Sequence, residues 1–172
     1  MDQEVFDNEC RKLARDSVFI KKAVDALVEK HGQDLDEFVL KVRDLLQLVK
    51  QAKMEEYDDE SLQMQIIKLP TLLYLAGNGL EDIGAESELA VYNKKETYNK
   101  IIQGLDTSSY TITDKKAAAE RGSETEEMLK NIYDRAYKKL KGKLDHAIKL
   151  LESLKKVADF RIAKINKGKG GE

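Results

Sequence analysis

The sequence predicts an all-α protein that is organised around a long antiparallel helical hairpin and assembles into oligomers. The chain of 172 residues contains one proline, and three of its ten glycines lie in the last five residues. It therefore lacks the frequent turn residues that a sandwich or a barrel requires. Two long stretches in its second half carry apolar residues at alternating spacings of three and four, which is typical of amphipathic helices. Charged residues make up 36% of the chain, which is well above an ordinary globular composition and indicates long, solvated helices.

The first 60 residues are predicted to form an N-terminal arm of two or three short helices that make a helical hairpin. Val24 and Val28 belong to one of these helices, which we expect to end at Gly32. The next helix is expected to run from about residue 34 to residue 54. An acidic stretch at residues 55–60 then interrupts the apolar pattern and marks the predicted boundary of the arm.

Residues 61–165 are predicted to form the long hairpin. Its first helix is expected to begin at Pro70, because the N–H that proline lacks is not needed in a first turn, and to continue for about 35 residues. Gly77 and Gly79 predict a distortion in this helix, since glycine weakens a helix interior.

The connection between the two long helices is predicted at residues 104–113, where serine and β-branched residues favour a short β-arm. Asp114 is expected to cap the second long helix, which runs to about Ile165 with an interruption near Gly122. Residues 166–172 are predicted to be a disordered basic tail. Because a hairpin of two helices leaves much of both apolar seams uncovered, we expect the N-terminal helices, further copies of the chain, or both to cover them.

Residue types that carry catalysis or bind metals are few and scattered. Cys10 is the only cysteine, and His31 and His146 are the only histidines, whereas a zinc site needs three or four such ligands in register. The acidic clusters lack the ligand spacing of a calcium loop, and no glycine-rich phosphate loop is present. We therefore expect no enzymatic activity, no metal and no cofactor.

The charge is distributed unevenly, although the net charge is only −2. Residues 1–129 hold 17 basic and 27 acidic side chains, whereas residues 130–172 hold 13 basic and 5 acidic ones. A basic helix can bind a phosphate backbone by releasing counterions, without reading the base sequence. Solvated helix faces also carry such lysines, so both interpretations stay open. Tyr133 and Tyr137 offer rings for base stacking, but their seam spacing favours core packing.

The order of elements in the second half resembles a known family. A helix opens at Lys68-Leu69-Pro70, a short excursion follows, and a second long helix ends in the segment 150–165. Over about residues 66–165 the chain resembles the UvsY-type recombination mediators of tailed phages. The matching positions near the end are Phe160, Arg161, Ile162 and Lys164. The resemblance implies a ring-like homo-oligomer that binds single-stranded DNA and helps to load a recombinase against a single-strand binding protein.

We therefore expect a non-catalytic phage protein that binds single-stranded DNA and acts as a recombination mediator. The expected DNA-binding residues combine the comparable region of the first long helix in that family with the basic stripe of the last helix: Lys94, Lys95, Lys100, Lys138, Lys141, Lys149, Lys156, Arg161 and Lys164. The alternatives are a helical structural or assembly protein of a virion and an inhibitor or adaptor that binds a host protein. No signal peptide and no run of about 18 apolar residues is present, so we expect a location in the bacterial host cytoplasm and no membrane contact.

Overall fold

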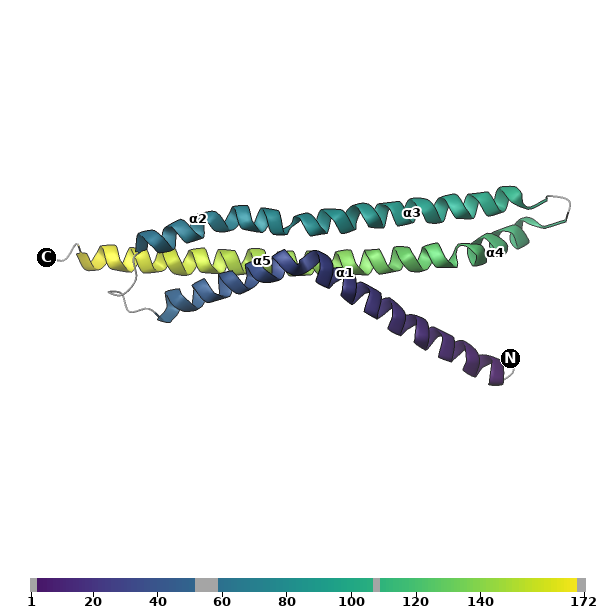
Figure 1. The fold of residues 1–172 in the computed structure, drawn as a ribbon, viewed down its shortest axis with the longest axis horizontal. Coiled ribbons are helices and arrows are strands. Elements are labelled where there is room, and N and C mark those ends of the chain that lie inside the picture. Colours follow the sequence, from purple (N-terminus) through teal and green to yellow (C-terminus); the bar gives the residue numbers. More distant parts are fainter. Residues whose placement is uncertain (1–2, 52–58, 107–108, 170–172) are drawn as a thin grey trace. The chain divides into compact units, whose positions relative to one another are not determined.

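The computed structural model describes the chain at residues 3–51, 59–106 and 109–169 (Figure 1). These residues contain helices and no strand, which confirms the predicted all-α fold. The helices are α1 (Gln3–Gln51), α2 (Asp59–Ala76), α3 (Asn78–Gly104), α4 (Ile112–Gly122) and α5 (Glu124–Lys169).

The chain forms two compact units that interleave along the sequence. Unit 1 comprises Met1–His31 and Leu80–Lys139, and unit 2 comprises Gly32–Gly79 and Leu140–Glu172. Helices α1 and α5 therefore contribute one part to each unit. This division differs from the predicted arm, hairpin and tail, whose boundaries were expected near residues 60 and 165.

The predicted short helices of the N-terminal arm are wrong, because α1 is a single helix of 49 residues. Buried side chains recur along it at spacings of three, four and seven from Val24 to Val49, so the apolar seam continues past Gly32. A Cβ atom at Gly32 would lie 3.0 Å from Cδ2 of Leu140. This glycine permits close packing of α1 on α5 within unit 2 and does not end the helix.

The break between α2 and α3 lies at Gly77, as the glycines predict. The Gly77 N–H still donates to the carbonyl oxygens of Leu73 and Tyr74, at 3.0 and 3.1 Å, so the backbone stays nearly helical there. The predicted start at Pro70 is wrong, because α2 begins at Asp59 and Pro70 lies inside it. The predicted β-arm is also wrong: no strand occurs at residues 105–106 or 109–111, and residues 107–108 lie outside the described chain.

Helix α4 begins with a capping box, and the predicted N-cap at Asp114 is wrong by three residues. The N-cap is Thr111, whose Oγ1 accepts from the Asp114 N–H at 3.2 Å, while the Asp114 carboxylate accepts from the Thr111 N–H at 3.2 Å. The Thr111 hydroxyl, which donates to the Asp114 carboxylate at 2.6 Å, and the Thr111 N–H together hold the pKa of Asp114 below its usual value. The predicted interruption near Gly122 is confirmed, since α4 ends there and α5 begins at Glu124. A Cβ at Gly122 would collide with Ile101, so the glycine permits close approach to α3.

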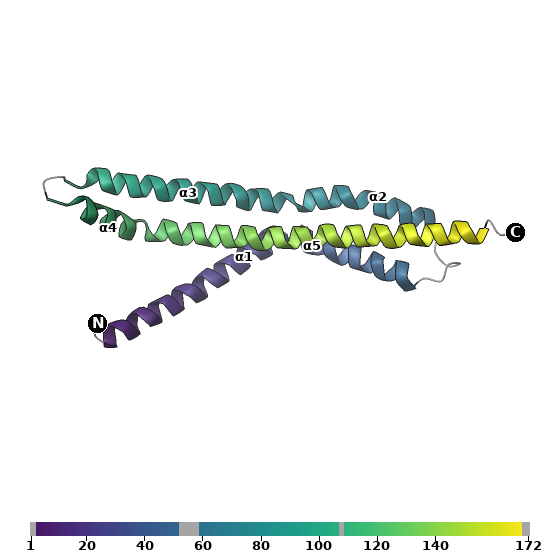
Figure 2. The same ribbon diagram turned by 180° about the vertical axis from the view of Figure 1, so that it is seen from behind.

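Unit 1 holds α3 antiparallel to the first part of α5, and the two helices lie side by side in both views (Figures 1 and 2). Ser87 Oγ donates to Oδ1 of Asp134 at 2.6 Å, and nearer the end of α3, Thr97 Oγ1 donates to Oε1 of Glu126 at 3.2 Å. The α5 partner thus moves backwards as α3 advances, which defines the antiparallel direction. Polar side chains therefore occupy part of this helix interface.

Unit 2 has a three-helix core made by the second part of α1, by α2 and by the second part of α5. Asp36 pairs with Lys143 and the Val49 carbonyl accepts from Arg161, so α1 runs parallel to α5 here. The core is apolar and consists of Leu35, Phe38, Val42, Leu45, Val49, Ile66, Leu69, Ala76, Ala147, Leu151, Leu154 and Ala158. In this unit the N-terminal helix covers the hairpin seam, which was one of the two expected solutions.

Candidate nucleic-acid interface

The part of α5 in unit 2 has one buried and one basic side. Leu151, Leu154 and Ala158 face the core. The opposite side exposes Lys149, Lys156 and Lys164, which recur at spacings of seven and eight and form what we call the α5 basic row. Seven residues of helix correspond to about 10 Å, so these lysines follow one line along the helix. None of the three forms an ion pair within the described residues.

Phe160 adds an exposed aromatic ring to this row. Its side chain is 74% exposed, although phenylalanine is usually buried. Lys156 and Lys164 lie four residues before and after it, and such positions are neighbours on a helix surface. A ring between two ammonium groups provides a stacking face for a base together with charges for the flanking phosphates.

An acidic row limits the width of this surface. Asp145, Glu152 and Asp159 are exposed and follow one another at seven-residue spacing, three or four positions away from the lysines. The basic row is therefore a narrow line. Such a line suits a single strand, which needs few contacts per copy, better than a wide duplex.

Two further predicted residues on α5 are exposed, and one is not. Lys141 in unit 2 and Lys138 in unit 1 are exposed. Arg161 is only 8% exposed, and its Nη1 donates to the Val49 carbonyl oxygen at 3.3 Å. It follows Leu154 by seven residues and Ala158 by three, so helical geometry places it in the buried seam. Its guanidinium joins α5 to α1.

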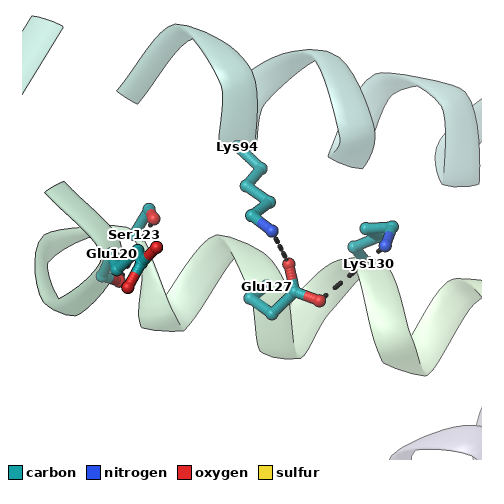
Figure 3. A network of polar contacts seen from close by, with 5 residues as sticks. All are labelled: Lys94, Glu120, Ser123, Glu127 and Lys130. Atoms are coloured by element: carbon teal, nitrogen blue, oxygen red, sulfur yellow. Dashed lines mark hydrogen bonds and ion pairs between the residues drawn. The ribbon is translucent and has the colours of Figure 1, made fainter. Parts of the chain in front are cut away.

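The lysines of α3 have carboxylate partners in unit 1. Figure 3 shows Lys94 reaching from α3 to Glu127 on α5, which also pairs with Lys130 at 3.7 Å. The bond from Lys94 holds the pKa of Glu127 below its usual value. Nearby, Ser123 Oγ donates to the carbonyl oxygen of Glu120 at 3.2 Å and satisfies the polar group at the α4–α5 break.

The remaining two α3 lysines differ from each other. Lys100 pairs with Glu96 one turn earlier, at 2.7 Å, and this bond raises the pKa of Lys100. Lys95 is exposed. Two of the three positions to which the family resemblance points therefore have their charge compensated within unit 1.

The aromatic residues confirm one expectation and add a residue to the site. Tyr133 and Tyr137 are partly buried, and a Cβ at Gly84 would lie 3.5 Å from the Tyr137 ring, so Tyr137 packs against α3. Phe160 was identified only as a family match, not as a stacking residue. Its distance of two residues from both Ala158 and Ile162 places it almost opposite the seam, and this signal was present in the sequence.

The described part of the chain holds no cluster of metal-ligating side chains. No set of three or more His, Cys, Asp or Glu residues there is arranged to hold a metal ion. His146 is exposed on α5. Nδ1 of His31 lies 3.9 Å from Oδ2 of Asp82 within unit 1. The side chain of Cys10 lies outside the described residues.

No model of a protein family matches the chain. The curated proteins and the solved structures contain no significant match either. None of the helices within the described ranges is both long and apolar enough to cross a membrane. The geometry of the α5 basic row is therefore the main support for a functional proposal.

Proposed function

We propose that this protein is a non-catalytic, oligomeric phage protein that binds single-stranded DNA. The observation that carries the proposal is the α5 basic row, in which the exposed Phe160 lies between Lys156 and Lys164. Lysines bind phosphates irrespective of sequence, and an aromatic ring stacks on any base, so the row suits a single strand of arbitrary sequence.

In this proposal several copies act together on one strand. A row with few contacts binds weakly by itself, and the neighbouring acidic row weakens it further. Linked copies raise the effective concentration of each site, so an oligomer can hold DNA tightly without new contacts. The resemblance to UvsY-type mediators supports the finer proposal that the bound strand is presented to a recombinase, against a single-strand binding protein, in the bacterial host cytoplasm.

The test is binding to a fluorescent single-stranded oligonucleotide as a function of salt. We expect binding at low salt that weakens steeply as salt rises, because counterion release drives it. In the test variant, Lys149, Lys156 and Lys164 are all replaced by Glu. Its affinity should fall at least tenfold, since three attractions become three repulsions.

The matched control carries the same change of charge away from α5. Lys21, Lys30 and Lys68 are exposed, and replacing all three by Glu alters the net charge equally. This control should bind within about threefold of the parent, since exposed substitutions have small effects. Equal losses in both variants would indicate only a general electrostatic effect and would contradict the proposed surface.

A protein-binding role is the second candidate, and α2 favours it. Met64, Ile67 and Tyr74 are 54%, 68% and 73% exposed, and helical spacing places them on one face. A contiguous exposed apolar face marks a protein-interaction site. This observation suits an assembly protein or an adaptor, and the absence of oligonucleotide binding at low salt would make that candidate the better one.

A further inference from the structure

Two exposed surfaces of this chain each present apolar side chains and carry opposite charges. The first, the α1 patch in unit 1, consists of Arg15, Val18, Phe19 and Lys22. Their spacings of three and four place all four side chains together on one face of the helix. Val18 is 56% exposed and Phe19 is 59% exposed. An apolar pair flanked by two cations is a typical anchor for a protein interface, where a buried aromatic residue supplies much of the binding energy.

The second surface, the α1–α2 groove, lies within unit 2. Phe38 forms part of its lining, with Leu72 and Leu75 from α2. Leu72 is 36% exposed and Leu75 is 51% exposed, so the groove presents apolar surface to solvent. Asp34, Glu37 and Lys41 form its polar side. Neither of the two carboxylates forms an ion pair within the described residues.

We propose that the α1 patch of one copy docks into the α1–α2 groove of a second copy. Val18 and Phe19 then cover Leu72 and Leu75, and the two cations of the patch face Asp34 and Glu37. Both surfaces are exposed in the single chain, which leaves each of them open to another copy.

This contact joins two different surfaces, so it does not close after two copies. The growing assembly still offers one unfilled groove and one unfilled patch. Such heterologous contacts produce a ring when the rotation closes and a filament when it does not. The inference does not rest on DNA binding, because neither surface includes a residue of the α5 basic row.

The test uses two variants with reversed charges and their mixture. The patch variant carries Arg15→Glu and Lys22→Glu, and the groove variant carries Asp34→Lys and Glu37→Lys. Molar mass is measured by light scattering at micromolar concentration. We expect the parent to be larger than a dimer and each variant alone to be monomeric, since like charges then face each other. The mixture should recover the parental mass, because the reversed patch matches the reversed groove.

A control variant with Lys116→Glu and Arg135→Glu, two exposed residues outside both surfaces, has the same charge change as the patch variant and should keep the parental mass. Circular dichroism of each variant establishes that the helices are intact, and a misfolded variant would not recover on mixing. A monomeric parent, a patch variant of parental mass or a monomeric mixture would each overturn the proposal. The patch variant should bind a short oligonucleotide as well as the control does, so a failure of DNA binding is separable from a failure of assembly.

Discussion

Most of the ion pairs among the described residues lie in unit 1, whereas unit 2 shows a single one, between Asp36 and Lys143. In unit 1, the lysines at 94 and 100 are bound by Glu127 and Glu96, and Asp25 binds Lys139 at 2.7 Å. In unit 2, an apolar core joins the three helices, and most lysines of α5 point away from it. Charge near a helix interface stabilises the fold, whereas charge on an outer face remains available to a ligand. The number of lysines alone does not identify a binding surface.

The largest change in the free energy of unfolding is expected from a substitution in the apolar core of unit 2. Leu154 is fully buried there. Replacing it by Ala removes apolar contacts and leaves a cavity, so the free energy of unfolding should fall by about 2–5 kcal/mol. Chemical denaturation followed by circular dichroism measures this change. A loss under about 1 kcal/mol would show that the apolar core does not dominate the stability of unit 2.

Gly122 and Gly142 allow a comparison between a helix surface that is closely packed and one that is open to solvent. Gly122→Ala should gain less stability than Gly142→Ala, because Cδ1 of Ile101, the end of a flexible side chain, must first move out of the way. A Cβ at Gly142, by contrast, would enter open space, with no neighbouring atom within 4 Å. Gly142→Ala should therefore raise the stability by up to about 1 kcal/mol, since alanine favours the helix. Chemical denaturation of both variants measures the two changes, and an equal gain in both would contradict the close approach of α3 at Gly122.

The ion pairs of unit 1 predict a loss of stability in acid. Bonds to Lys94 and Lys139 lower the pKa values of Glu127 and Asp25 below those of the unfolded chain. Their stabilisation is fully present above the unfolded pKa values and is lost as the pH falls through the lowered ones. Glu127→Gln should reduce this dependence, by no more than about 1 kcal/mol because solvent screens the pair. Thermal unfolding of both proteins from neutral to acid pH measures the difference, and an unchanged dependence would contradict the pairing.

The sequence predicted the helices well because their apolar spacing is a local property. It also located the interruptions near Gly77 and Gly122. The expected break at Gly32 was wrong because the benefit of close packing against Leu140 depends on another helix. The pairing of Lys94 with Glu127 depends on the register of α3 against α5, which no local pattern specifies. The burial of Arg161, by contrast, can be predicted from its spacing to Leu154 and Ala158 in the apolar seam. The family resemblance instead implied that Arg161 binds DNA.

The central claim is that the α5 lysines of unit 2 contact DNA and the α3 lysines of unit 1 do not. The most direct test neutralises each set by Gln, with Lys149, Lys156 and Lys164 in one variant and Lys94, Lys95 and Lys100 in the other. The measured quantity is the slope of the logarithm of single-stranded DNA affinity against the logarithm of salt concentration. We predict that the slope of the α5 variant becomes shallower by about 2, as expected for three lost phosphate contacts. The α3 variant should keep the parental slope. A shallower slope in the α3 variant alone would contradict the account.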